Sequence, residues 1–151
     1  MGLSNGLAIA IELNSTGALR LLAERLRLER ADDTHLTGPA LWVSAGEPDL
    51  NYKLMIQEGF HFTPNLYLGF RLDPGSDDYP QGSRLMLRAT LLLLEHGRDG
   101  VLLFNGEHII LQRLSGQLVL NEDARNWVDG LQLEGEIRLP HERRSLPSPL
   151  Q

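Results

Sequence analysis

The chain has 151 residues, a length that suits one domain with a substantial hydrophobic core. Twenty acidic residues against fourteen lysines and arginines give a formal net charge of -6, which disfavours nucleic acid and anionic membranes as main partners, because both attract clustered positive charge. The sequence contains no cysteine, which excludes a disulfide framework and a thiolate metal site.

The first residues predict a strand and no export signal. The start lacks a basic stretch, and Glu12 interrupts the apolar run after it, so we expect neither a signal peptide nor a membrane span, and a cytoplasmic location. From Leu7 to Leu13 large apolar residues alternate with smaller or charged ones. This is the period of a strand with one deeply buried face.

Two helices are predicted by capping residues and helical spacing. Asn14, Ser15 and Thr16 offer caps for a helix that continues to about Arg27. Ser83 is expected to cap the second helix, and Gly97 to follow its end as a C′ glycine. Both segments carry an apolar stripe, so both are expected to pack on a sheet.

The stretch from Glu29 to Tyr79 has a looser pattern. Its apolar pieces are short and are separated by prolines, which predicts strands joined by long loops. It contains nine acidic and three basic residues, an excess of six that equals the net charge of the whole chain. The acidity is therefore regional.

The segment from 100 to 120 predicts a three-stranded antiparallel meander. Asn105-Gly106 and Ser115-Gly116 separate three apolar runs, and such dipeptides supply the positive φ angles that tight hairpin turns need. After it, the stretch 121–130 is expected to form a short helical turn that presents Trp127.

Together these elements predict a single α+β domain over residues 1–140, with a flexible tail over 141–151. The sheet is expected to be mainly antiparallel, with two principal helices packed on one face and the meander at the C-terminal side. Three aromatic residues inside apolar strands are predicted to be core residues: Trp42, Phe70 and Phe104.

The sequence shows no motif for catalysis, a metal or a cofactor, so we expect none of the three and predict a protein that is not an enzyme. Glycine-rich phosphate loops and nucleophile elbows are absent from it. Paired carboxylates lie in predicted loops, where they are usually solvated. The histidines do not have the spacing of metal ligands: His35, His61, His96, His108 and His141.

Candidate partner-binding residues are acidic residues of the loops, as a charged rim, and the aromatic side chains that lie in or next to these acidic stretches, a combination that protein interfaces favour. For the tryptophan, which follows the meander, a core position is an equal alternative. The candidates are Glu47, Asp49, Tyr52, Asp77, Asp78, Tyr79 and Trp127.

The order of elements resembles that of a known family. A strand and a helix are followed by the strand Pro-Asn-Leu-Tyr-Leu-Gly-Phe-Arg-Leu-Asp (64–73), a helix that leads into the meander, and Trp127. This order resembles one of the Sit-type immunity families, small cytoplasmic proteins encoded beside polymorphic toxins of contact-dependent bacterial competition. The similarity covers about residues 7–128 and is strongest over 84–128.

The resemblance implies a non-enzymatic protein that binds one cognate toxin tightly and blocks its active site or its assembly. The acidic loops would attract a basic toxin, because a field of opposite sign raises the association rate. The oligomeric state, monomer or dimer, stays open.

Two other classes of function are compatible with the sequence. A secretion chaperone is also small, acidic and α+β, but it holds a disordered segment of an effector and is normally a dimer with exposed apolar grooves. A small enzyme would need a site assembled by the fold, with His61 or His108 as candidate residues.

Overall fold

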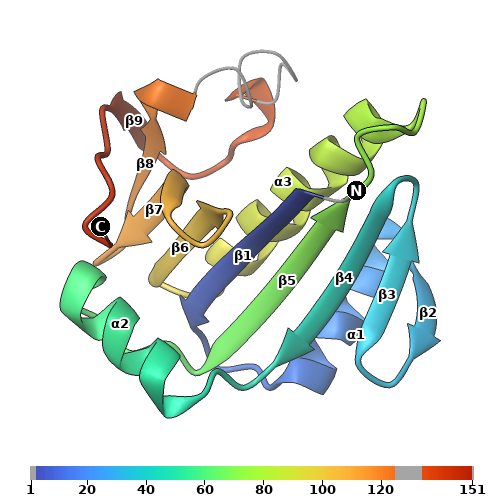
Figure 1. The fold of residues 1–151 in the computed structure, drawn as a ribbon, viewed down its shortest axis with the longest axis horizontal. Coiled ribbons are helices and arrows are strands. Elements are labelled where there is room, and N and C mark those ends of the chain that lie inside the picture. Colours follow the sequence, from blue (N-terminus) through green and yellow to red (C-terminus); the bar gives the residue numbers. More distant parts are fainter. Residues whose placement is uncertain (1–2, 125–133, 151) are drawn as a thin grey trace.

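The computed structural model describes residues 3–124 and 134–150, in which nine strands form one sheet with helices on both faces (Figure 1). The elements are β1 (Leu3–Ala10), α1 (Ser15–Leu26), β2 (Glu29–Asp32), β3 (His35–Gly38), β4 (Leu41–Gly46), α2 (Leu50–Phe60), β5 (Leu66–Leu72), α3 (Tyr79–Leu94), β6 (Asp99–Phe104), β7 (His108–Leu114), β8 (Gln117–Asn121) and β9 (His141–Arg144), with short 3-10 turns at Glu122–Ala124 and Glu134–Glu136. The spatial order is β2-β3-β4-β5-β1-β6-β7-β8-β9, and every pairing is antiparallel except that of β8 with β9. The predicted α+β class and mainly antiparallel sheet are confirmed.

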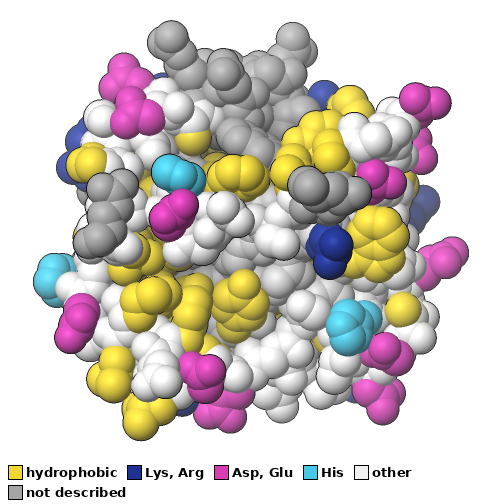
Figure 2. All heavy atoms as spheres, viewed as in Figure 1, with side chains coloured by type: hydrophobic (Ala, Val, Ile, Leu, Met, Phe, Trp, Pro, Cys, Tyr) yellow, Lys and Arg dark blue, Asp and Glu magenta, His cyan; other side chains and the backbone are white. Residues whose placement is uncertain are grey.

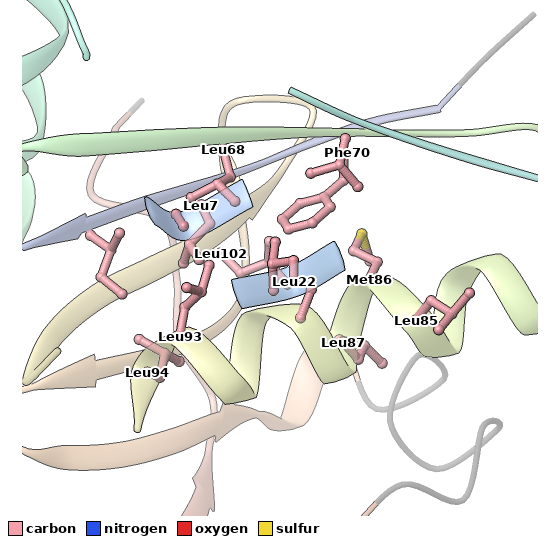
Figure 3. Packing of buried hydrophobic residues seen from close by; sticks show 14 of the residues in the cluster. Leu7, Leu22, Leu68, Phe70, Leu85, Met86, Leu87, Leu93, Leu94 and Leu102 are labelled. Carbon is pink, nitrogen blue, oxygen red and sulfur yellow. The ribbon is translucent and has the colours of Figure 1, made fainter. Parts of the chain in front are cut away.

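The larger core lies between one face of the sheet and the helices α1 and α3. Side chains alternate along β5, so Leu68 and Phe70 point to these helices and meet Leu22 of α1 and Met86 of α3 (Figure 3). All four side chains are buried, and their contact fixes both helices on this face. No helix of the described residues is long and apolar enough to cross a membrane.

The two predicted helices are present, with different boundaries at α3. The side-chain oxygen of Asn14 accepts a hydrogen bond from Gly17 N at 2.8 Å and caps α1, as predicted. Helix α3 begins at Tyr79, so Ser83 is a buried residue inside it and not its cap. Gly97 does not adopt a positive φ. A Cβ there would lie 2.6 Å from the carbonyl oxygen of Ala10, so this glycine allows a close approach of the chain to β1.

A third helix, α2, corrects the prediction of strands and loops between residues 29 and 79. Asp49 caps it through a 2.8 Å hydrogen bond from Tyr52 N, and His61 ends it with φ of 65°. Ile56 and Phe60 pack into a second hydrophobic cluster with Val101, on the face of the sheet opposite α1 and α3. The two predicted helices, α1 and α3, thus lie on one face as expected, and α2 adds an unexpected helix on the other.

The predicted meander is confirmed as β6, β7 and β8. Asn105 and Gly106 have φ of 55° and 77°, and Ser115 and Gly116 have φ of 52° and 84°. Positive φ at both residues matches the twist of the flanking strands. It allows the two-residue connection between Leu114 and Gln117 and the three-residue connection between Phe104 and His108.

The C-terminal segment, expected to be a flexible tail over 141–151, is ordered against the sheet in the described residues. Strand β9 adds to β8 in parallel, and Leu146 and Leu150 pack against the second cluster. The buried amide of Asn121 holds this segment: its Nδ2 donates to Ile109 O and Leu146 O, and its Oδ1 accepts from Leu146 N at 3.0 Å. One side chain thus pairs with both backbone groups of Leu146.

Replacing Asn121 by alanine is expected to lower the free energy of unfolding by about 1–3 kcal/mol, because buried backbone groups lose their hydrogen-bond partners. Chemical denaturation measures this loss, and hydrogen exchange should show faster exchange over 141–150. Asn51→Ala, at an exposed position of α2, is the matched control. Equal stability of the two variants would contradict the holding role of Asn121.

Candidate functional site

The face of the sheet opposite α1 and α3, which we call the front face, is only partly covered by α2 (Figure 1). Strands β4, β5 and β1 carry the open part. Because side chains alternate along a strand, the front face receives Trp42 and Ser44 from β4, Tyr67 and Arg71 from β5, and Ser4 from β1. Trp42, Arg71 and Ser4 are exposed there.

A row of small residues makes a hollow in this face. Ser44, Gly69 and Gly6 are partners across three neighbouring strands. A Cβ on Gly69 would lie 2.8 Å from Ser44 Oγ, and one on Gly6 would lie 2.5 Å from the hydroxyl oxygen of Tyr67. The side chain of Tyr67 therefore occupies the space over Gly6, and the hollow lies over Ser44 and Gly69. Its volume is about 290 Å³, and its lining also includes Trp42, Arg71, His35 and Tyr67.

The exposed large hydrophobic residues of the described chain gather on the same side of the molecule. They are Trp42, Leu50 and Leu54, with 46%, 69% and 53% of their surface exposed. Leu50 and Leu54 lie one turn apart on the outer side of α2, since Ile56 and Phe60 occupy its inner side. Figure 2 shows hydrophobic side chains in several separate groups on this face, and most acidic side chains toward its outline.

His35, at the edge of the hollow, is held by Asp32. The Oδ1 atom of Asp32 lies 2.9 Å from His35 Nδ1 and accepts hydrogen bonds from the backbone and hydroxyl of Thr34 at 2.8 and 3.1 Å. The Thr34 backbone bond first, and then the bond to His35, lower the pKa of Asp32 to about 2. The stabilisation of the folded state by the ionised Asp32 carboxylate is therefore present above the ordinary pKa of 3.8, and it is lost as the pH falls toward 2.

Tyr67 lines the other side of the hollow and is supported by a second tyrosine. Tyr52 of α2 and Tyr67 of β5 meet edge to face, with ring centroids 5.2 Å apart and an interplanar angle of 83°. Burial raises the pKa of both phenols, and for Tyr52 the nearby Tyr67 raises it further. Both hydroxyls therefore stay protonated near neutral pH.

The structure places the predicted partner-binding residues in two groups at opposite ends of β5. At one end Glu47 pairs with Lys53 at 3.3 Å, and Asp49 caps α2. Beyond the other end lie Asp77 and Asp78. Strand β5 has seven extended residues, so its two ends are about 20 Å apart.

The predicted aromatic contacts need correction. Tyr52 and Tyr79 are partly buried, since they pack against the second cluster and the larger core respectively. Trp127 lies outside the described residues. Trp42 was expected in the core and is exposed, whereas Phe70 is buried as predicted and Phe104 is half-buried.

Several residues of the site were not predicted. Arg71 and His35 reach the front face only because β3, β4 and β5 pair in this register. For Trp42 the sequence does contain a signal: Leu41, Val43 and Ala45 alternate with it, and in a strand that pattern places the tryptophan on the opposite face.

The residues considered for a fold-assembled enzyme have local contacts. His61 ends α2, and the ring of His108 stacks on Phe104 with a centroid distance of 6.4 Å, with its Nε2 3.6 Å from Glu107. Within 3–124 and 134–150, no three histidine, aspartate or glutamate side chains lie close enough together to hold a metal ion.

Comparison with curated proteins gives no match, and neither does comparison with solved structures. A family model described as SitI3-like matches residues 6–130, which include every element from β1 to β8 except the first three residues of β1. The match covers most of the chain, and the protein belongs to the SitI3-like family.

Proposed function

We propose that this protein is an immunity protein that acts in the cytoplasm, where it binds one cognate bacterial toxin and neutralises it by protein–protein contact. The SitI3-like family name supports this class of function. The proposed action needs no catalysis, because covering the active site of a toxin or blocking its assembly is sufficient.

The observation that carries the proposal is the position of the exposed large hydrophobic side chains. Trp42, Leu50 and Leu54 lie on the front face, beside a hollow that Tyr67 and Arg71 also line. Aromatic residues and arginine are enriched at the centres of protein interfaces, and exposed apolar surface with polar surroundings is typical of a site where another protein binds.

The charge distribution favours a basic partner. The acidic segments β2 to β3, β4 to α2 and β5 to α3 lie around the front-face strands, and the stretch 29–79 that contains them holds the whole net negative charge. Opposite charge on a partner raises the association rate, and this effect weakens as salt is added.

Co-expression with the products of the adjacent genes tests the proposal. We expect one neighbour to stop growth of a naive host, this protein to restore growth, and the two to co-purify as a stable complex. A neighbour that is harmless alone and becomes soluble or secreted only with this protein would contradict immunity and would indicate a chaperone. A light-scattering mass of the free protein then gives its oligomeric state.

A further inference from the structure

Arg71 is an exposed arginine that lines the hollow and has no partner among the described residues. Its guanidinium makes no ion pair or hydrogen bond with any residue in 3–124 or 134–150, in contrast to Lys53, which pairs with Glu47. Arg71 lies directly across from Trp42 in the register of β4 and β5, on the same face. Cross-strand neighbours of this kind have Cβ atoms about 5 Å apart, so the two side chains can act on one ligand group.

The position of Arg71 limits what can bind there. A protein that contacts Leu54 of α2 and Trp42 of β4 together also covers the hollow between them, and it removes water from the guanidinium. Burying an unpaired charge is strongly unfavourable, so a tight partner has to supply an acceptor at this point. A carboxylate meets this need best, because its two oxygens match the guanidinium fork and its charge cancels that of the arginine.

We infer that the hollow receives an aspartate or glutamate side chain of the partner, whose carboxylate pairs with Arg71 while its methylene groups pack on the indole of Trp42. The inference rests on the proposed function and names the central contact of that site. Ser44 and Gly69 give the side chain room, since larger residues at these two positions would fill the hollow. The partner is then a protein with a basic surface around one protruding acidic residue.

Two other groups could meet Arg71 instead. Backbone carbonyl oxygens could accept hydrogen bonds from the guanidinium without carrying charge, and an apolar side chain could pack on Trp42 and leave Arg71 at the edge in water. These alternatives differ from a carboxylate in one measurable respect: neither makes the effect of an Arg71 variant depend on a particular acidic residue of the partner.

The test uses the full-length protein and the neighbour-encoded protein that co-purifies with it. Arg71→Gln is expected to weaken the complex by at least about 30-fold, with Arg71→Lys intermediate, because truncating one member of a buried charge pair leaves the other unpaired. Arg20→Gln, an exposed arginine of α1 on the opposite face, is the matched control and should bind as the wild type does. Circular dichroism and melting temperature confirm that each variant is folded.

A double-mutant cycle identifies the acceptor. The acidic residues of the partner that hydrogen exchange shows to be protected in the complex are changed singly to Asn or Gln, and each is combined with Arg71→Gln. For one of them the two losses should be clearly less than additive. Strict additivity for all of them, or an Arg71→Gln variant that binds as tightly as Arg20→Gln, would overturn the inference. Failure of the wild-type protein to bind any neighbour would overturn the proposed function itself.

Discussion

Phe70→Ala is expected to lower the free energy of unfolding by about 3–5 kcal/mol, a loss that can leave little of the protein folded. Phe70 is 1% exposed and lies at the centre of the larger core, between β1 and β4 and beneath α1 and α3 (Figure 3). Its removal leaves a cavity that helices on one side and strands on the other cannot close without moving. Urea denaturation followed by circular dichroism measures the change.

Phe70→Leu serves as the matched control, because it retains most of the apolar volume and is expected to cost clearly less than the alanine variant. If alanine at position 70 were as well tolerated as leucine, the core around α3 would be packed differently from the arrangement described above.

Trp42→Ala is expected to have the opposite profile, with nearly unchanged stability and a loss of binding of at least about 30-fold. The residue is one position from the inward-facing Val43, yet its side chain is 46% exposed on the front face. Exposed substitutions usually change stability by about 0.5 kcal/mol or less, whereas removal of a tryptophan at the centre of an interface commonly costs 2 kcal/mol or more in affinity. Protection of the host from the neighbouring toxin should be reduced accordingly.

Trp42→Phe keeps a flat apolar side chain at the same place and should retain most of the binding. A Trp42→Ala variant that binds and protects as the wild type does would show that the proposed partner binds elsewhere. A variant that unfolds would show that the indole has a structural role, and Leu54→Ala on α2 then tests the front face by an independent residue.

The elements that were predicted correctly depend on short-range signals. The capping hydrogen bond of α1 joins Asn14 and Gly17, which are three residues apart in the sequence. The turns at Asn105-Gly106 and Ser115-Gly116 are specified by the dipeptides themselves. Helix α2 was missed because its apolar residues lie on two sides: Ile56 faces the sheet, and Leu50 and Leu54 face solvent, so no single stripe appears. The parallel pairing of β8 with β9 is a long-range contact that no local pattern encodes.

The candidate site was predicted only in part, for a related reason. The sequence shows that acidic residues are concentrated between 29 and 79, but it does not show that β5 separates Asp49 from Asp78. Arg71 and Trp42 are distant in sequence and come together through the pairing of β4 with β5. A surface made by several strands becomes visible only when their register is known.

The central place of β1 sets the order in which the protein can be completed during synthesis. This strand is made before its two neighbours, and Asn5 pairs with Phe70 and Phe104, the second about 100 residues further along the chain. At a synthesis rate of about 5–20 residues per second, the apolar residues of β1 stay without one or both neighbouring strands, β5 and β6, for roughly 5–20 s. If the proposed function holds, a newly made chain gives no protection during that interval, and a cell that meets the toxin depends on molecules folded beforehand.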